Sequence, residues 1–215
     1  MAKDIVIVGS SEFAKEIEWI IKRSNCISRR YNFLGFIDND ISITNVIGND
    51  DFLYHYDQEL SVVIGIADTH IRRKLASIFC QNSHLRFPNL IDPSVIYPED
   101  IQLGQGNIIC AGSVITVDIS IGSFNIINLN CTVGHQACLH DFITLNPGVN
   151  VSGDVVLEDG VNIGTGSQIL QGRTIGANTI IGAGAVITCD IPNDCTAVGI
   201  PAKVIKDRRG NDYFG

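Results

Sequence analysis

Large aliphatic side chains occupy every sixth position over much of the second half of the chain. The positions are Leu103, Ile109, Ile115, Ile121, Ile127, Val133, Leu139, Leu145, Val151, Leu157, Ile163, Ile169, Ile175, Ile181 and Ile187. An α-helix repeats about every 3.6 residues and a half-buried strand about every 2, so neither element explains this spacing. A period of six is typical of a hexapeptide solenoid, in which each unit forms one face of a triangular coil. We expect about five stacked turns, because one unit cannot bury its own apolar face.

A second pattern accompanies the first. Four positions after the aliphatic residue, the chain favours small or β-branched side chains, which fit a tight inward corner. Examples are Ser113, Cys131, Ala137, Val149, Val155, Ser167, Thr179 and Ala185. Gly, Asn and Asp supply the turns between faces. An ordinary antiparallel sandwich with accidental spacing is the alternative, and the unbroken run of matches at one period disfavours it.

The first ninety or so residues lack this period and alternate between strand and helix patterns. Strands are predicted at residues 4–9, 33–38 and 61–66, and amphipathic helices at 12–23 and 71–79. This alternation indicates a small parallel α/β domain. Prolines between residues 88 and 98 interrupt regular structure, so we expect one domain at 1–90 and the coil at 91–215.

Composition limits the partners. The net charge is −8 and the isoelectric point is near 4.9, which argues against nucleic acid and anionic membranes as partners. The first apolar run is too short for a signal peptide or a membrane span. Seven cysteines without a C-x-x-C motif favour reduced thiols in a cytoplasmic protein over a disulfide framework or a metal site. We therefore expect no metal and no membrane insertion.

In a parallel α/β domain, ligands bind beyond the carboxyl ends of the strands. The helix start after the first strand offers backbone amides to an anion, and a carboxylate after the second strand can accept hydrogen bonds from a ribose or base. Because the G-x-G-x-x-G pattern is incomplete, a purely structural role for this loop remains open. The candidate residues for binding an acceptor are Gly9, Ser10, Ser11, Asp38, Asn39 and Asp68.

The order of these parts resembles a known family. The chain opens with an I-x-I-x-G strand, continues with Gly-Phe-Ile-Asp from residue 35, and has Ile-Gly-Ala-Gly-Ala-Val-Ile from residue 181. Val-Gly-Ile-Pro-Ala-Lys-Val-Ile follows from residue 198. The arrangement is similar to that of the bacterial sugar acyltransferases, relatives of sialic acid O-acetyltransferases and of N-acetyltransferases that modify nucleotide-linked 4-amino sugars. The resemblance covers nearly the whole chain.

The resemblance implies a Rossmann-like N-terminal domain followed by a left-handed parallel β-helix, assembled as a homotrimer. It also implies that acetyl-coenzyme A is the co-substrate and lies between neighbouring coils. His135 falls in the family's Gly-His-Asp/Glu motif as the catalytic base, with Gln136 at the acidic position. The residues expected near coenzyme A are Thr144, Gly153, Thr165 and Ala183.

The chemistry supports His135 independently. Acetyl transfer requires removal of a proton from the attacking group, and imidazole titrates in a suitable range. A backbone amide must hold the developing oxyanion, and Gly153 is the candidate donor. Gln136 departs from the family pattern because an amide oxygen can accept from the imidazole but carries no charge. An exposed turn histidine without a role is the alternative for His135.

The predicted function is therefore transfer of acetyl from acetyl-coenzyme A to the amino group of a nucleotide-linked 4-amino-4,6-dideoxy sugar. The alternative acceptors are sialic acid, another glycan hydroxyl and serine. Two other classes of protein remain open. One is a zinc hydratase of the carbonic anhydrase type, since His135 and His140 have the spacing of two of its zinc ligands. The other is a trimeric scaffold without catalysis.

Overall fold

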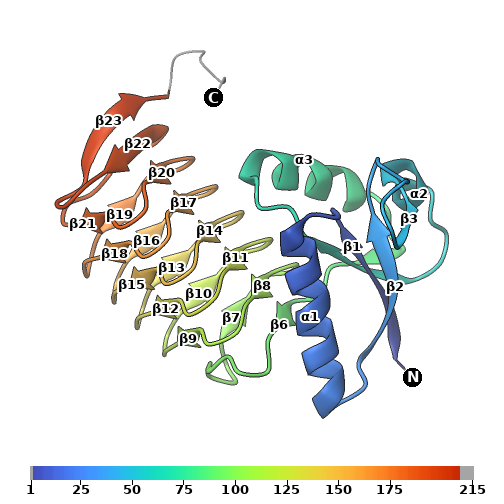
Figure 1. Cartoon of the computed structure of the whole chain (residues 1–215). Coiled ribbons are helices and arrows are strands. Elements are labelled where there is room, and N and C mark those ends of the chain that lie inside the picture. Colours follow the sequence, from blue (N-terminus) through green and yellow to red (C-terminus); the bar gives the residue numbers. More distant parts are fainter. Residues whose placement is uncertain (1, 209–215) are drawn as a thin grey trace.

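The computed structural model describes residues 2–208, which form two domains packed side by side (Figure 1). The N-terminal domain contains a parallel five-stranded sheet in the order β3-β2-β1-β4-β5. Its strands are β1 (Lys3–Val8), β2 (Tyr31–Ile37), β3 (Val46–Gly48), β4 (Leu60–Ile64) and β5 (Leu85–Arg86). Its helices are α1 (Glu12–Ile27), α2 (Asp50–Tyr54) and α3 (Thr69–Phe79).

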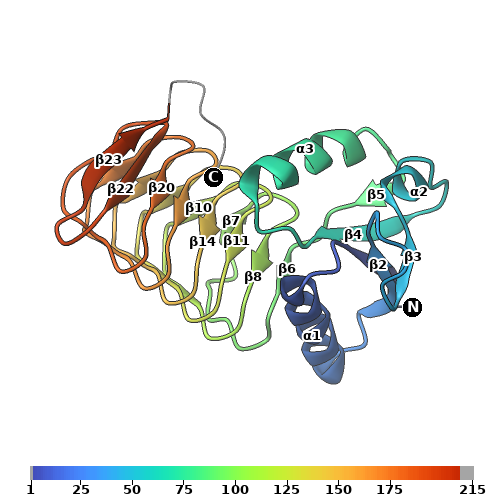
Figure 2. The ribbon, with the colours of Figure 1, turned by 45° about the horizontal axis from the view of Figure 1, so that its top comes forward.

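Helices cover both faces of this sheet (Figure 2). Side chains alternate between the faces of a strand, so Ile5 packs with Ile17 of α1 while Val6 packs with Leu75 of α3. All four side chains are buried. The result is the small α/β domain expected from the sequence, with helices on both faces of the sheet.

The second domain is a triangular coil of short parallel strands. The first sheet contains β7 (Gln102–Leu103), β10 (Ser120–Ile121), β13 (Cys138–Leu139), β16 (Val156–Leu157) and β19 (Thr174–Ile175). The second contains β6 (Leu90–Ile91), β8 (Ile108–Ile109), β11 (Ile126–Ile127), β14 (Thr144–Leu145), β17 (Asn162–Ile163), β20 (Ile180–Ile181), β22 (Cys195–Val198) and β23 (Lys203–Asp207). The third contains β9 (Val114–Ile115), β12 (Thr132–Val133), β15 (Asn150–Val151), β18 (Gln168–Ile169) and β21 (Val186–Ile187).

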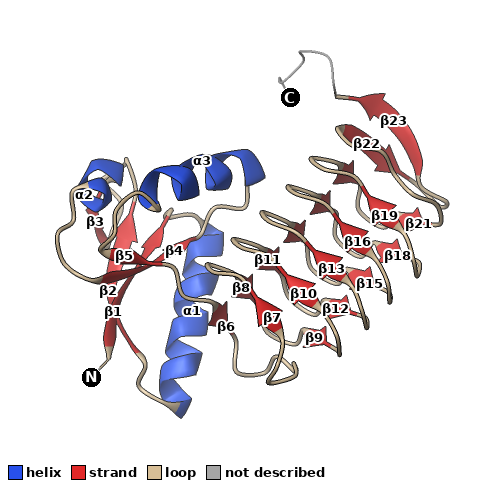
Figure 3. Ribbon diagram, turned by 180° about the vertical axis from the view of Figure 1, so that it is seen from behind, coloured by secondary structure: helices blue, strands red, loops and turns tan. Residues whose placement is uncertain are grey.

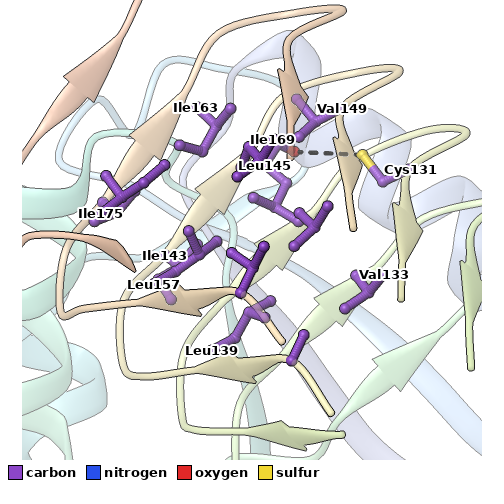
Figure 4. Packing of buried hydrophobic residues seen from close by; sticks show 14 of the residues in the cluster. Cys131, Val133, Leu139, Ile143, Leu145, Val149, Leu157, Ile163, Ile169 and Ile175 are labelled. Carbon is purple, nitrogen blue, oxygen red and sulfur yellow. Dashed lines mark hydrogen bonds between the residues drawn. The ribbon is translucent and has the colours of Figure 1, made fainter. Parts of the chain in front are cut away.

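Each strand pairs with strands one turn away; Ser120, for example, lies opposite Gln102 and Cys138. This parallel register closes the predicted solenoid into a left-handed β-helix. All the aliphatic residues at the sixfold period are buried except Leu103, which is partly buried at the start of the coil. Figure 4 shows these side chains from successive turns meeting in one interior. Burying each contributes about 1.5–3 kcal/mol.

An asparagine ladder lies at one inward corner of the first turns. The side-chain oxygen of Asn89 accepts from the backbone N–H of Asn107 at 2.9 Å, and Asn107 does the same for Asn125 at 2.9 Å. Asn125 in turn accepts from the backbone N–H of Ile143. Each side chain thus satisfies a donor one turn further along the coil, where a buried unpaired N–H would be costly.

The N-terminal domain covers the outer face of the second sheet at its first strands, including β8 and β11. Ile108 and Ile126 point outward from the coil and are buried against Ile17 and Ile21 of α1. Figure 3 shows α1 beside β6 and β8, with α3 further along the same side of the coil. At the other end, β22 and β23 pair as an antiparallel hairpin. No helix within residues 2–208 has the length and apolar character needed to cross a membrane.

Candidate active site

His135 lies at a corner of the coil, in the turn between β12 and β13. Its imidazole is exposed. The corner forms because the next residue, Gln136, adopts a left-handed backbone conformation with φ of 59°. Residues with this left-handed conformation recur every six positions from Gly106 to Gly184. Each one makes a corner, and three corners complete one turn of the coil. His135 therefore lies in a turn of the regular repeat rather than in a long loop.

Gln136 is the hydrogen-bond neighbour of the imidazole. Its side-chain oxygen lies 3.4 Å from Nδ1 of His135. An amide oxygen can only accept, so this contact favours the tautomer that carries its proton on Nδ1. Nε2 is then left with a lone pair, as a general base requires. Gln136 can thus select the tautomer, but it lacks the negative charge that would stabilise the protonated imidazole.

Gly153 lies one turn of the coil beyond His135 and directly against its ring. A Cβ added at position 153 would lie 2.5 Å from Nε2 and 2.9 Å from Nδ1 of His135. Only glycine leaves room for the ring at this place. The neighbouring Asp154 donates its backbone N–H to the carbonyl of His135 at 2.9 Å, which joins the two corners.

The backbone N–H of Gly153 has no hydrogen-bond acceptor within residues 2–208. The backbone nitrogen of Gly153 lies close to Gly134: a Cβ added at Gly134 would be 2.7 Å from it. An unpaired N–H next to a general base can bind an oxyanion that forms there. The structure therefore brings together two of the predicted groups, the imidazole of His135 and the amide of Gly153.

Two of the residues expected near coenzyme A lie on a different edge of the coil. Thr165 and Ala183 are exposed in successive turns, and the carbonyl of Thr165 accepts from the N–H of Gly184 at 2.8 Å. Beside them, no atom lies within 4 Å of the position that a Cβ of Gly166 or Gly184 would take. The sheet formed by β12, β15, β18 and β21 separates this open edge from His135. One chain alone does not bring the two edges together.

Thr144 was expected near coenzyme A, but in the structure it is buried beside α3. Its side chain is 2% exposed, and its hydroxyl accepts from Nη2 of Arg72 at 2.9 Å. Arg72 reaches it from α3, so Thr144 lies in the junction between the domains. A role in binding coenzyme A stays a prediction for this residue, and its hydroxyl already has a partner.

The predicted acceptor residues gather at one edge of the N-terminal sheet. Because β1, β2 and β4 are neighbours and parallel, the loops that follow them meet. Ser10 donates to the carboxylate of Asp38 at 2.5 Å, and the other oxygen of Asp38 accepts from the N–H of Asp40 at 3.1 Å. Gly9 has φ of 97°, and its N–H donates to the carbonyl of Ile37. These contacts fix the loop after β1 against the loop after β2.

The two helix starts at this edge differ. Ser11 occupies the N-cap of α1, but its side chain makes no capping hydrogen bond, so the first-turn amides there are open to an anion. Asp68 caps α3 by accepting from the N–H of Ile71 at 2.8 Å. Asn39 hydrogen-bonds Asp50, whose pKa is nevertheless raised, chiefly by burial. The edge therefore offers one open helix start and several carboxylates.

His140 and the cysteines contribute no further catalytic group to this corner. Nδ1 of His140 lies 3.7 Å from Glu158. All seven cysteines are free thiols, and burial raises the pKa of Cys131 to about 11, which keeps it protonated and unreactive. Within the described chain, no group of three His, Cys, Asp or Glu side chains could hold a metal ion.

Each domain contains a stretch that matches a known family. Residues 4–79 match the PglD N-terminal domain, and residues 154–189 match the bacterial transferase hexapeptide (six repeats). The whole structure is similar to the acetyltransferase domain of PglB from Neisseria gonorrhoeae in complex with acetyl coenzyme A. The sequence identity is 26% and the TM-score 0.87, and the match covers 95% of this chain and 100% of that one.

A second similar structure is a variant of perosamine N-acetyltransferase from Caulobacter crescentus in complex with CoA and GDP-perosamine. Here the identity is 27% and the TM-score 0.88, with 96% of this chain and 99% of that one covered. Among curated proteins, galactoside O-acetyltransferase from Escherichia coli is 48% identical over 46 residues. This match covers 20% of the present chain and only 23% of that relative.

In fold and in these likenesses, the chain is similar to the hexapeptide-repeat acyltransferases, and its coil is a left-handed β-helix. Within this class, the resemblance to bacterial sugar acyltransferases that was predicted from the sequence is confirmed. The more specific part of this resemblance is the match of residues 4–79, which precede the coil, to the PglD N-terminal domain.

Proposed function

We propose that this protein transfers the acetyl group of acetyl-coenzyme A to the amino group of a nucleotide-linked 4-amino-4,6-dideoxy sugar. The main support is the likeness over 96% of the chain to a perosamine N-acetyltransferase in complex with CoA and GDP-perosamine. Likeness to a PglB domain in complex with acetyl coenzyme A supports the choice of donor. The proposal places the reaction in the cytoplasm and in the synthesis of bacterial surface glycans.

In the proposed reaction, Nε2 of His135 removes a proton from the neutral amine as its nitrogen attacks the thioester carbonyl. The N–H of Gly153 donates a hydrogen bond to the oxyanion of the tetrahedral intermediate. When the intermediate collapses, the C–S bond breaks and the imidazolium returns the proton to the sulfur of coenzyme A. Gln136 holds the tautomer throughout. The step is a direct transfer, and no cysteine forms an acyl intermediate.

The position of the two coil edges supports a homotrimer as part of this proposal. In one chain, the edge of Thr165 and Ala183 lies a full sheet away from the edge of His135. If neighbouring chains pack around a threefold axis, the open edge of one chain can meet the catalytic edge of the next. The donor would then lie between coils, with Thr165 and Ala183 on one side and Gly153 on the other.

Asp38, Asn39 and Asp68 are the proposed contacts to the base and ribose of the acceptor, and Gly9, Ser10 and Ser11 to its phosphates. The open amides at the start of α1 suit the diphosphate. O-acetylation of a glycan hydroxyl is the second candidate, favoured by the short match to galactoside O-acetyltransferase. That match covers only 20% of this chain, and the match of residues 4–79 to the PglD N-terminal domain favours the first candidate.

Release of free coenzyme A, measured with a thiol reagent, tests the proposal. The acceptors are 4-amino-4,6-dideoxy sugars linked to uridine, guanosine or thymidine diphosphate, together with sialic acid, a galactoside and serine. We expect release only with an amino sugar, and mass spectrometry of the product should show one added acetyl group. Release with a hydroxyl acceptor alone would establish the second candidate. Release with none of them would contradict both.

A further inference from the structure

Arg72 is an arginine buried at the junction between the two domains. It belongs to α3, and its side chain is 1% exposed. Nε donates to the carbonyl of Phe124 at 2.9 Å, and Nη1 to the carbonyls of Ile66 and Ala67 at 2.8 and 2.9 Å. Nη2 donates to the carbonyls of Phe142 and Ile143 and to the hydroxyl of Thr144, at 3.0, 3.3 and 2.9 Å. All three nitrogens are therefore used.

None of these acceptors carries a charge. Burial lowers the pKa of Arg72 to about 10, so the guanidinium still holds its proton at neutral pH. Taking a cation out of water costs free energy that neutral carbonyls repay only partly, and an apolar side chain of similar size often fills such a place at less cost. What the guanidinium adds is a rigid fork of donors in fixed directions. Its chemistry thus suits holding several backbone segments in one geometry.

The segments that Arg72 holds come from both domains. Ile66 and Ala67 follow β4 and lead into Asp68, in the proposed acceptor site. Phe124 and Phe142 occupy the same corner in two successive turns of the coil. Arg72 therefore connects the loop that meets the acceptor with the coil that carries the base.

The coil corners are themselves unusual at this point. Phe124 and Phe142 adopt left-handed conformations with φ of 57° and 60°, which bulky side chains rarely do. Their rings stack at 5.5 Å, and Phe87 meets Phe124 edge-on at 5.4 Å. Phe124 is 5% exposed and packs in the core of the N-terminal domain. The strained corners and Arg72 thus form one junction.

We propose that Arg72 is a positioning residue for acetyl transfer, which fixes the loop at residues 66–68 relative to the coil. This inference rests on the proposed function, because the acceptor must reach the base from a site that includes Asp68. Arg72 itself touches neither substrate. Its loss should loosen the acceptor loop and leave the coil and its donor site intact.

The test compares Arg72→Met and Arg72→Lys with Arg86→Met. Arg86 is an exposed arginine of the same domain whose side-chain hydrogen bonds, among residues 2–208, go to the nearby carbonyls of Ser83 and Leu85. Hydrogen exchange of the free protein should rise at residues 66–68 in both Arg72 variants. For Arg72→Met we expect kcat/KM for the acceptor to fall by about a hundredfold, mainly through KM. Binding of acetyl-coenzyme A should stay unchanged.

Arg72→Lys keeps the charge but loses the planar fork, so we expect partial recovery of the acceptor KM. If Arg72→Met does not fold, Arg72→Lys alone carries the test. Normal exchange at residues 66–68 with a normal acceptor KM, even with a lower melting temperature, would overturn the inference and leave Arg72 a stabilising residue. Failure of the proposed function would show differently, as no transfer by the wild-type protein.

Discussion

At the residue scale, the proposed base has an uncharged partner. The side-chain oxygen of Gln136 lies 3.4 Å from Nδ1 of His135. An amide in this place can orient the ring, but it does not stabilise the imidazolium as a carboxylate would. Because Gln136 adopts the left-handed corner conformation, its side chain starts from a backbone position set by the coil.

Replacing Gln136 by Glu tests this partnership. The new carboxylate stabilises the protonated imidazole, so His135 should lose its proton only at higher pH. We expect the acidic limb of the pH profile of kcat/KM to move up by about one pH unit. Gln105→Glu, on an exposed corner remote from His135, should leave the limb in place. If the acidic limb of the Gln136→Glu variant does not move, the side chain at position 136 does not influence the protonation of the base.

His135 and Gly153 could be proposed from the sequence because they match the motif of the resembling family and its position near the thioester. The role of Arg72 could not. Arg72 and Arg73 adjoin on an amphipathic helix, where charged residues usually face water. Only the fold shows that the coil covers one of them. The burial of Thr144 could not be predicted for the same reason, since the sequence does not tell which outer face of the coil the other domain covers.

At the scale of elements, the period of six predicted the strands of the coil because their inward side chains stack turn upon turn. The short elements β3 and α2 and the terminal hairpin were not predicted, as they are too brief to show a period or lie beyond the repeat. Helix α1 runs to Ile27 rather than ending at residue 23, and α3 begins at Thr69 rather than residue 71. The α/β pattern predicted these helices, but their ends depend on local contacts.

An ion pair joins α1 to the first turn of the coil. Nε and Nη2 of Arg23 donate to the two carboxylate oxygens of Asp92 at 2.7 and 3.1 Å. Burial would raise the pKa of Asp92, but hydrogen bonds from Arg23 and Ser94 outweigh burial and hold it below its usual 3.8. The ionised carboxylate therefore favours the folded state above that pH, and its contribution is lost as the pH falls through the folded-state pKa.

Asp92→Asn should accordingly lower the free energy of unfolding at pH 7 by about 1–3 kcal/mol. The difference from the wild-type protein should shrink as the pH falls below about 4. Urea unfolding at a series of pH values measures both. Asp57→Asn, at an exposed position, is the matched control. A difference that stays constant down to pH 3 would show that the ionised pair is not its source.

At the scale of the whole molecule, each of the two domains carries one part of the proposed site. The N-terminal edge presents an open helix start and carboxylates, and the coil presents the proposed base and an unpaired amide. The sequence predicted both parts, because each follows from a local pattern. It did not show their relative placement, which depends on α1, on Arg72 and on the two phenylalanine corners. The homotrimer remains a prediction that the separation of the coil edges supports.

The central claim is that His135 is the base for acetyl transfer. The most direct test is acceptor-dependent release of coenzyme A by the wild-type protein, His135→Asn and His140→Asn. His140 is a matched control, an exposed histidine of the coil near Glu158. We predict that His135→Asn slows release by about 10²–10⁴-fold while still binding acetyl-coenzyme A, and that His140→Asn does not slow it. Full activity in His135→Asn would contradict the account.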